Sequence, residues 1–395
     1  MAKNDPAKLV AMLQEKFGEK SVMLAHEMPV RPAVSSGSLA LDYAIGIGGM
    51  PTDRLVEICG ENGTGKTTLA LMTMSNALDM NPGRFALIMD LEHKLDRDWI
   101  VQLIGEERAA RTVLTWPDYA EDATNLYRAA VGGDDTTKFP PGQFCFAMFD
   151  SIGGAPTRRR GDDATKASYG GNAIAIAEFA RSAAGLSHKY ECLTIGINQV
   201  RADMSGYNQL VVPGGKAWLH ATSLRLQVKR GKGKVVEKIN GEDYQLGFEV
   251  TCKVVKSGVS APGRVASWWF FNVPSEKYGF GVDRMEEIVR LGLLTEVIER
   301  RGSYYWHASL PPDSKGENKL LGRERLVEFL RGDLSAQGVI SAEVMDRLKN
   351  GGYGAEVAPM SEDPESPLEE AGYVNLLGQS EFDDTNILRE SRHDQ

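Results

Sequence analysis

The stretch that decides the fold is Gly60-Glu61-Asn62-Gly63-Thr64-Gly65-Lys66-Thr67, which matches the pattern G-x-x-x-x-G-K-[S/T] and continues into Thr68. It follows the apolar run Leu55–Cys59, an expected strand, and opens the helical pattern Thr67–Leu78. Glycines let backbone amides turn toward phosphates, and the N-terminus of a helix adds positive potential. The stretch therefore predicts a P-loop for ATP, in which Lys66 neutralises the β- and γ-phosphates and Thr67 binds Mg²⁺. A glycine-rich turn that only caps a helix fits this context poorly.

Apolar runs alternate with helical patterns on the C-terminal side of the P-loop. The runs are Phe85–Met89, Phe144–Phe149 and Cys192–Ile197, and one of the helical patterns is Ile174–Leu186. This alternation predicts an α/β fold with a doubly wound, mostly parallel sheet that is covered on both faces. Further strands are expected at Leu224–Val228, Glu249–Val255 and Trp268–Val273, and short helices at Arg284–Leu291, Arg323–Leu330 and Ala342–Leu348. The change of pattern near residue 282 predicts a small C-terminal domain.

Two acidic residues follow expected strands and are candidates for chemistry. Asp150 comes directly after Phe144–Phe149, where a carboxylate can hold Mg²⁺ through water. Glu92 lies just beyond Phe85–Asp90 and could act as the general base that activates water. Acidic residues in such places are also common in ordinary turns, so these assignments depend on the P-loop. His93 is expected to be structural.

Composition is typical of an ordinary globular protein. The chain has 395 residues, of which 42% are hydrophobic and 25% are charged. No apolar run reaches the roughly 18 residues of a membrane span, and the first residues lack the apolar core of a signal peptide. We therefore expect a cytoplasmic protein without a membrane partner. Cys59, Cys145, Cys192 and Cys252 lie far apart, which favours buried, reduced thiols over disulfides or a metal site.

The negative charge is concentrated at the C-terminal end. Residues 351–395 hold eleven acidic residues and two arginines, so their net charge of −9 equals that of the whole chain. Such a segment is typical of a solvated, disordered tail. A second hypothesis is that the tail competes with DNA phosphates for basic surface.

In this order, the motifs resemble the bacterial RecA family from about residue 8 to about residue 335. The matching segments are Ser35–Asp42, Val56–Thr68, Asp90–His93, Phe149–Ser151, Ile197–Arg201, Gly214–Ala217 and Lys253–Lys256. The P-loop alone occurs in many NTPases, but Glu92 combined with Asn198-Gln199-Val200-Arg201 is far more specific. The resemblance implies a RecA-type ATPase core and an N-terminal helix that packs on the next subunit.

The resemblance also implies roles for individual residues of an ATP site. Glu92 would activate water, and Gln199 would sense the γ-phosphate and transmit that state to a DNA-binding loop. Asp96 and Trp99 would lie beside the adenine, where Trp offers a stacking face. Lys256 would reach the ATP of the neighbouring subunit and stabilise the transition state only after assembly.

Two segments match the DNA-contacting loops of the family, at about residues 153–171 and 200–214. Positive and amide side chains there would grip phosphates, while Tyr169 and Met204 would occupy gaps in stretched DNA. The full set of candidate DNA contacts is Arg158, Arg159, Arg160, Tyr169, Gly170, Arg181, Arg201, Met204, Tyr207, Asn208, Gly214 and Gly215. Taken alone, Arg158–Arg160 would more often be a solvated surface run.

The chain also departs from the family pattern at several positions. Glu61 replaces a proline of the P-loop, and Gly258 replaces a second interface lysine, which leaves trans activation to Lys256. His220 stands where the family has an aromatic residue at a subunit interface, and the second DNA loop is slightly shorter. These changes bear on hydrolysis and its coupling to DNA more than on the fold.

The resemblance therefore predicts a DNA-dependent ATPase that forms helical filaments on single-stranded DNA and exchanges strands with a duplex. Its expected parts are an N-terminal assembly helix and linker (1–34), an ATPase core (35–270), a C-terminal domain (271–350) and an acidic disordered tail (351–395). Expected ligands and partners are ATP, Mg²⁺, single- and double-stranded DNA and further copies of the chain. A single-strand-binding protein and a self-cleaving repressor are additional candidates. The alternatives are a hexameric P-loop helicase and a DNA-binding mediator that does not hydrolyse ATP.

Overall fold

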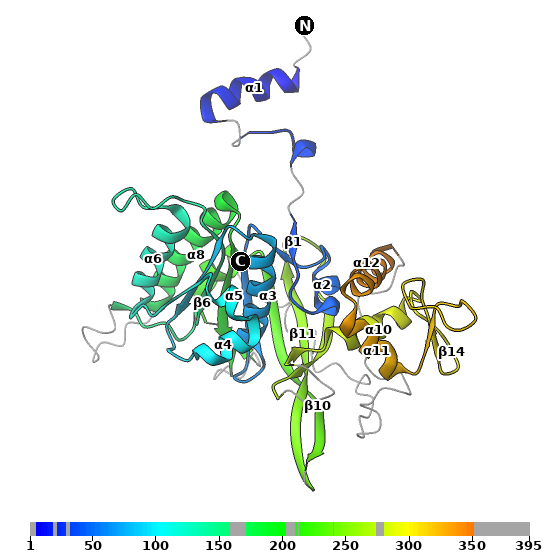
Figure 1. The fold of residues 1–395 in the computed structure, drawn as a ribbon. Coiled ribbons are helices and arrows are strands. Elements are labelled where there is room, and N and C mark those ends of the chain that lie inside the picture. Colours follow the sequence, from blue (N-terminus) through cyan, green and yellow to red (C-terminus); the bar gives the residue numbers. More distant parts are fainter. Residues whose placement is uncertain are drawn as a thin grey trace, which may run out of the picture. The chain divides into compact units, whose positions relative to one another are not determined.

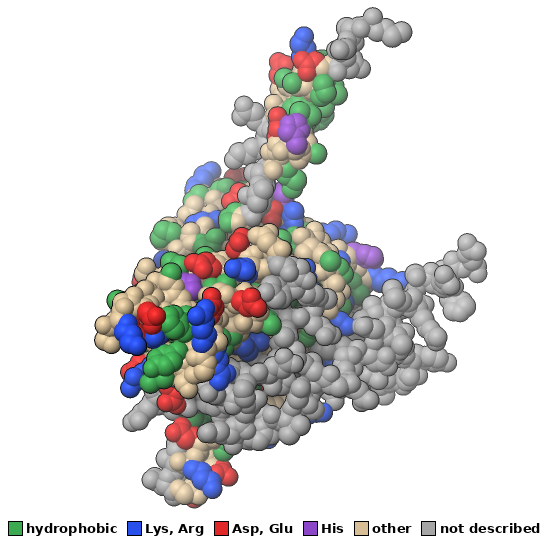
Figure 2. Space-filling view, turned by 90° about the vertical axis from the view of Figure 1, so that its right-hand side faces the viewer, with side chains coloured by type: hydrophobic (Ala, Val, Ile, Leu, Met, Phe, Trp, Pro, Cys, Tyr) green, Lys and Arg blue, Asp and Glu red, His purple; other side chains and the backbone are tan. Residues whose placement is uncertain are grey.

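The protein is described by a computed structural model that covers residues 5–18, 22–28, 32–158, 171–202, 210–211, 213–239, 241–273 and 280–350. It divides into two compact units, Met1–Pro32 and Ala33–Gln395. The first unit contains helix α1 (Pro6–Phe17) and the short 3-10 helix η2 (Ala25–Glu27). The Asp5 carboxylate caps α1 by accepting the Ala7 N–H at 3.1 Å. No residue of α1 is buried, and its apolar Leu9, Met12 and Phe17 are all exposed. The first unit accordingly shows hydrophobic side chains on its surface (Figure 2).

The second unit is built on a nine-stranded sheet with the order β13-β12-β11-β10-β3-β7-β6-β4-β5. Neighbouring strands are parallel from β10 to β5 and antiparallel from β13 to β10. The strands are β3 (Leu55–Gly60), β4 (Phe85–Asp90), β5 (Thr112–Thr115), β6 (Phe144–Asp150), β7 (Leu193–Gln199), β10 (Leu224–Ile239), β11 (Glu242–Ser257), β12 (Val265–Phe271) and β13 (Gly281–Val282). This large, mostly parallel sheet confirms the predicted α/β fold class.

Helices cover both faces of the sheet (Figure 1). One face carries α3 (Lys66–Met80) and α4 (Arg97–Ile104), with α5 (Glu106–Ala109) following, and the other carries α6 (Ala120–Gly132) and α8 (Gly171–Tyr190). Successive side chains of a strand point to opposite faces. In β6, Phe146 and Met148 accordingly join the hydrophobic core beneath α3, whereas Ala147 and Phe149 join the one beneath α6 and α8. The unbroken apolar runs in the sequence are therefore strands buried from both sides.

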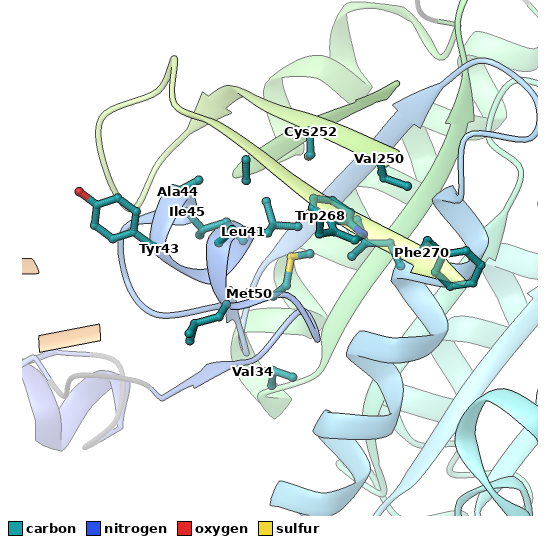
Figure 3. Packing of buried hydrophobic residues seen from close by; sticks show 14 of the residues in the cluster. Val34, Leu41, Tyr43, Ala44, Ile45, Met50, Val250, Cys252, Trp268 and Phe270 are labelled. Carbon is teal, nitrogen blue, oxygen red and sulfur yellow. The ribbon is translucent and has the colours of Figure 1, made fainter. Parts of the chain in front are cut away.

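The core beneath α3 continues into the C-terminal elements of the same unit. Helix α2 (Leu39–Ile45) is buried along its whole length and packs against the sheet, α10 (Arg284–Leu294) and α12 (Leu334–Asn350), while α11 (Arg323–Gly332) packs against α10 and α12. Leu41 and Ile45 of α2 point toward Met50 and Trp268 (Figure 3). A small sheet of β14 (Glu299–Arg301), β15 (Tyr304–Trp306) and β16 (Lys319–Leu321) lies between α10 and α11 along the chain. Two short pairs complete the description, β1 (Ala33–Val34) with β2 (Met50–Pro51) and β8 (Arg201–Ala202) with β9 (Leu210–Val211).

A buried carboxylate joins α2 to α10. The Ser38 hydroxyl donates to Glu287 Oε1 at 2.6 Å, and the Leu39 N–H donates to Glu287 Oε2 at 2.8 Å. Ser38 is also the N-cap of α2, so Glu287 lies against the positive end of that helix. Burial nevertheless dominates and raises the pKa of Glu287 to about 7.

Strands β10 and β11 form a hairpin that is longer than the apolar runs in the sequence predict (Figure 1). Only Leu224–Val228 of β10 pairs with β3, and the remaining residues pair with β11 as far as Ile239 opposite Glu242. This distal part carries charged residues such as Lys234, Glu237 and Lys238. The strand expected around Leu224–Val228 is therefore present, but β10 runs on to Ile239 because polar, exposed strands lack the apolar signal on which the prediction relied.

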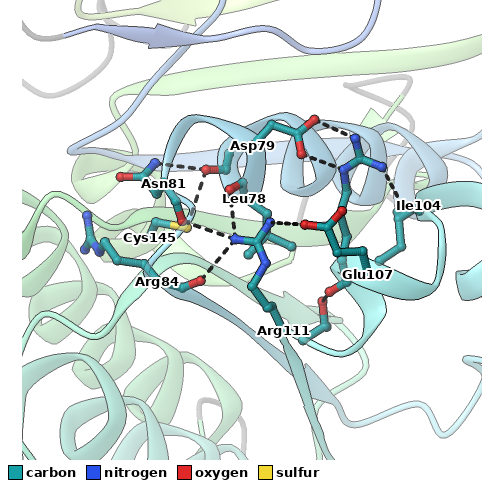
Figure 4. Close-up of polar contacts among 11 residues, drawn as sticks. Leu78, Asp79, Asn81, Arg84, Ile104, Glu107, Arg111 and Cys145 are labelled. Carbon is teal, nitrogen blue, oxygen red and sulfur yellow. Dashed lines mark hydrogen bonds and ion pairs between the residues drawn. The ribbon is translucent and has the colours of Figure 1, made fainter.

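The amino-terminal ends of the parallel strands are fastened by arginines. Arg111 donates to the Leu78 carbonyl at 2.9 Å and to the Asn81 carbonyl at 3.2 Å, at the C-terminal end of α3 (Figure 4). Arg108 pairs with Asp79 at 2.7 Å. The Arg111 contacts satisfy carbonyls at the end of α3, where a helix leaves its last carbonyls without partners. The candidate functional site lies at the opposite edge, at the carboxyl ends of the parallel strands.

All four cysteines are free thiols in the interior. Burial raises the pKa of each of them above the ordinary value. The predicted burial of the four cysteines is therefore confirmed.

Candidate functional site

The P-loop leaves β3 and enters α3 with the geometry that its glycines require. At Gly60 a Cβ would lie 2.2 Å from the Val228 carbonyl oxygen, so a side chain has no room there. Gly63 and Gly65 have φ of 73° and 91°, in the left-handed region that favours glycine. Glu61, Asn62 and Gly63 are exposed at the bend, whereas Thr64 and Thr68 are buried beside it. The loop thus presents backbone amides at the N-terminus of a fifteen-residue helix.

Lys66 and Thr67 occupy the first turn of α3. Lys66 Nζ donates to the Glu61 carbonyl at 2.6 Å, and burial holds the pKa of this lysine below its ordinary value. The Thr67 hydroxyl donates to Asp150 Oδ2 at 3.0 Å, which joins the P-loop to the end of β6. Burial raises the pKa of Asp150 to about 6. A hydroxyl and a carboxylate brought together beside a phosphate-binding loop fit the oxygen ligands that Mg²⁺ prefers.

Glu92 follows β4 and is held by three side chains. Gln199 Nε2 donates to Glu92 Oε1 at 3.0 Å. The Ser151 hydroxyl donates to the same oxygen, and Lys94 pairs with Oε2. Burial favours the neutral carboxyl, but the hydrogen bonds from Lys94 and Ser151 outweigh it and lower the pKa of Glu92. Glu92 is therefore an ionised carboxylate, as a general base must be.

The loop that presents Glu92 is shaped by Asp90, which is 1% exposed. Its carboxylate accepts the backbone N–H groups of Glu92, Lys94 and Leu95 at 3.2, 3.0 and 3.1 Å. His93 takes φ of 53° within this turn, in agreement with a structural role. Sequence reasoning missed Asp90, Lys94 and Ser151. An Asp that ends a strand is a local signal for such a turn, but nothing local reveals the contacts of Ser151.

Asp96 and Trp99 lie at the start of α4. The Asp96 carboxylate caps this helix by accepting the N–H groups of Asp98 and Trp99 at 2.9 and 3.1 Å. Trp99 is partly buried and packs against the core. The cap fixes the direction of the helix and thereby the position of the indole, while the Asp96 side chain stays exposed.

Lys256 lies at the end of β11, on the far side of β3 from Glu92 in the strand order. Its ammonium donates to the Leu219 and Thr222 carbonyls, each at 2.6 Å, at the C-terminal end of α9 (Gly215–Ala221). Burial and the neighbouring Arg225 hold the pKa of Lys256 below its ordinary value. Within one chain, Lys256 therefore contacts α9 and not the P-loop.

The candidate DNA contacts fall partly within the described residues. Arg158 is exposed and pairs with Asp122, and Arg181 is exposed on α8. Arg201 begins β8, and Gly214 and Gly215, with φ of 117° and 76°, open α9. The remaining candidates lie outside the described residues: Arg159, Arg160, Tyr169, Gly170, Met204, Tyr207 and Asn208.

Comparison with known proteins gives this arrangement a family. Residues 7–272 match the family model described as the RecA N-terminal domain. The chain belongs to the RecA family. The RecA protein of Thermotoga petrophila is 30% identical over 373 residues, covering 92% of this chain and 96% of that protein. The RecA protein of Heliobacterium modesticaldum is 28% identical over 359 residues, covering 89% and 95% respectively.

The RecA likeness extends beyond the matched core, because an alignment over 92% of the chain must include C-terminal residues after position 272.

Two of the positions that depart from the family pattern, Gly258 and Glu61, cause no steric conflict in this RecA-type fold. Gly258 donates its N–H to the Ser223 carbonyl at 2.7 Å, and a Cβ there would meet only ordinary contacts. The Glu61 side chain is exposed, and only its carbonyl holds Thr64 and Lys66. Among the helices that the structure describes, none is both long and apolar enough to cross a membrane.

Proposed function

We propose that this RecA-family recombination protein is a DNA-dependent ATPase that forms helical filaments on single-stranded DNA and catalyses homologous pairing and strand exchange. One observation carries the proposal: Gln199, which directly precedes the second DNA loop, donates a hydrogen bond to Glu92, the candidate base. A single contact thus links a segment suited to binding DNA with the group that would attack ATP.

In the proposed hydrolysis, Glu92 accepts a proton from the water that attacks the γ-phosphate. Lys66 would neutralise the β- and γ-phosphates, and the amides of Gly63–Thr68 would hold the phosphate oxygens. Mg²⁺, held by Thr67 and through water by Asp150, would withdraw charge from the phosphates. No group of three or more His, Cys, Asp or Glu side chains able to hold a metal ion occurs among the described residues, so phosphate oxygens would complete this site.

Assembly would complete the active site. Lys256 is held by α9 within its own chain, so it could stabilise the transition state only at the P-loop of a neighbouring subunit. The exposed apolar side chains of α1 offer a surface that a second copy of the chain could bury. Filament formation would therefore precede rapid hydrolysis.

DNA would be held mainly through its backbone. The arginines of both loops can grip phosphates without reading sequence, so pairing specificity would belong to the nucleic acid. Residues 1–350 carry no net charge, and residues 351–395 are negative. This distribution fits reversible binding of DNA better than permanent binding. We further propose that the protein acts in the cytoplasm, with a single-strand-binding protein and a self-cleaving repressor as additional partners.

The two alternative functions are not favoured. RecA proteins match this chain along nearly their whole length, which neither a ring-shaped helicase nor a mediator explains. An intact Lys66 and an ionised Glu92 also argue against a chain that does not turn ATP over.

The proposal is tested by ATP hydrolysis with and without poly(dT), at two salt concentrations, in the wild type and in Lys66→Ala. We expect strong stimulation by poly(dT), weaker stimulation at high salt, and no hydrolysis by Lys66→Ala. Hydrolysis that is independent of DNA would contradict the proposal. Electron microscopy that shows closed hexamers in place of filaments would contradict it as well.

A further inference from the structure

Glu57, in the middle of β3, is a carboxylate with no exposed surface. A buried charge is costly unless it is paired and hydrogen-bonded. The side chain has three donors, and each comes from a different element. Asn198 Nδ2 of β7 and Trp218 Nε1 of α9 donate to Oε1 at 2.8 and 2.7 Å, and Arg225 of β10 pairs with Oε2. Glu57 therefore ties α9 and the two strands beside β3 to one point.

Asn198 extends this network to the two ends of the second DNA loop. Its Nδ2 also donates to the Pro213 carbonyl at 2.7 Å, where the loop returns to α9. Its Oδ1 accepts the N–H of Gln199 at 3.0 Å, where the loop begins. Since Gln199 contacts Glu92, the path from the catalytic carboxylate to both ends of the loop runs through side chains held by Glu57.

Trp218 makes the position of α9 depend on β7. The indole is fully buried and lies over Gly196, where a Cβ would come within 2.3 Å of the ring. It also lies against Gly214 at the start of α9, with a would-be Cβ 3.1 Å from the ring. Such close packing leaves the indole little freedom to move alone. A displacement of Pro213 or Gly214 would therefore move Trp218 and with it the donor to Glu57.

The second oxygen of Glu57 leads toward the residue proposed to act on the neighbouring subunit. Arg225, which pairs with this oxygen, lies beside Lys256 in the antiparallel register of β10 and β11. Lys256 in turn holds the last carbonyls of α9. Arg225 Nη2 is buried and has no hydrogen-bond partner within the described part of the chain, so the Arg225–Glu57 pair is this guanidinium's main restraint.

We propose that Glu57 is a positioning residue that couples DNA binding to the ATP site, by holding the second DNA loop, α9 and Lys256 in one register. The inference rests on the proposed function and adds the element that transmits it. When DNA binds, Pro213 and α9 shift together, and Glu57 converts that shift into a new position of Gln199 on one side and of Lys256 on the other. A buried charge with three donors suits this task because its partners cannot move independently without leaving the charge unpaired.

The test uses the reciprocity of coupling: if DNA acts on the ATP site, ATP must change DNA affinity by the same free energy. The dissociation constant of fluorescein-labelled poly(dT) is measured with and without a non-hydrolysable ATP analogue, for the full-length wild type, Glu57→Gln and Glu287→Gln. Glutamine keeps the acceptor for Asn198 and Trp218 but turns an NH₂ group toward Arg225, so the second branch is lost. Glu287→Gln is the matched control, since Glu287 is also a buried, hydrogen-bonded carboxylate but joins α2 to α10.

We expect the ATP-induced change of DNA affinity to fall in Glu57→Gln by about 5- to 150-fold, the range of a typical coupling between two sites. Glu287→Gln should keep the wild-type ratio even if its melting temperature drops. An unchanged ratio in Glu57→Gln, or an equal fall in both variants, would overturn the inference. If Glu57→Gln does not fold, Trp218→Phe replaces it, and a wild-type ratio in that variant overturns the inference too. If the DNA affinity of the wild type is the same with and without the ATP analogue, the proposed function itself is refuted.

Discussion

Glu92 and Lys94 belong to one short turn, and their ion pair is the least expected feature of the candidate active site. The Lys94 side chain is 67% exposed, yet its ammonium contacts the carboxylate of Glu92, whose side chain is only 14% exposed. Its charge is one of the reasons why the pKa of Glu92 lies below the ordinary value. If Glu92 is the general base that we propose, it must be ionised, so we expect this pair to affect the pH below which hydrolysis fails.

Lys94→Ala should therefore shift the pH dependence of ATP hydrolysis. Without the lysine the pKa of Glu92 rises, so the acidic limb of the pH–rate profile should move to higher pH. Lys94→Arg keeps the charge and should retain the wild-type limb. The measurement is the initial rate of phosphate release with saturating poly(dT) across the pH range. Identical profiles for the alanine variant and the wild type would remove Lys94 from this role.

For single residues, the sequence predicts which residues belong to the candidate site better than it predicts which side chains they contact. The P-loop residues, Asp150 and Glu92 can be proposed from strand ends and glycine spacing, because parallel strands bring their carboxyl ends to one edge. Ser151 could not, since its contact with Glu92 depends on how two loops pack, and the Lys94 contact depends on the turn that the Asp90 carboxylate holds. Glu57 was also missed. It reads as one polar residue in an apolar strand, and only the folded sheet brings Asn198, Trp218 and Arg225 around it.

Among the elements, α1 carries its own prediction. Its apolar residues are exposed in the unit to which it belongs, and burying a leucine side chain contributes roughly 1.5–3 kcal/mol. Replacing Leu9 and Met12 by serine should weaken self-association by at least about tenfold, while the melting temperature of residues 33–350 stays unchanged. Sedimentation velocity with an ATP analogue and poly(dT) measures the assembly. Lys8→Ser with Lys16→Ser is the polar control, and wild-type filaments in the apolar variant would disprove the assignment.

The elements themselves were predicted where a local signal exists. The centres of β3, β4, β6 and β7 coincide with four apolar runs, and the expected N-terminal helix is present as α1. The strand order was not predictable in detail, because nothing in the sequence shows that β10 adds to β3 in parallel. The outer hairpin was missed since its residues alternate charge with small apolar groups and pack mainly on each other.

For the molecule as a whole, Glu287 predicts how stability varies with pH. Its pKa is raised from the ordinary 4.5 to about 7 by burial, so the folded chain binds this proton more tightly than the unfolded chain does. The resulting stability is complete below pH 4.5 and is lost as pH rises through 7. A shift of this size corresponds to about 3 kcal/mol.

Glu287→Gln, which cannot ionise, should remove this part of the pH dependence. The wild-type free energy of unfolding should fall more steeply between pH 5 and pH 8 than that of the variant, by up to about 3 kcal/mol. Asp42, whose pKa burial raises to about 6, is present in both proteins, so a pH dependence of its own remains in the variant. Urea titrations followed by tryptophan fluorescence give both free energies. Parallel pH profiles would show that Glu287 stays ionised in the fold.

Charge supplies the other prediction for the whole molecule. Residues 351–395, which lie outside the described part, hold the entire net charge of −9. Deleting them should strengthen binding to duplex DNA and lower its magnesium requirement, because the segment no longer competes with phosphates. Binding of a labelled duplex is measured at several Mg²⁺ concentrations, with a chain whose eleven acidic residues are changed to Asn or Gln as the control. Equal affinities in all three proteins would leave the tail without this role.

Because all four cysteines are buried, the protein has no thiol on its surface that a labelling reagent could reach. Because the thiolate is the reactive form, buried cysteines with raised pKa values are inert toward maleimides while the fold is intact. A single cysteine introduced at an exposed site, such as Val236→Cys on the outer hairpin, would then be the sole point of attachment for a dye. The native cysteines need no replacement, so filament growth and strand exchange could be watched on an otherwise unaltered chain, one molecule at a time.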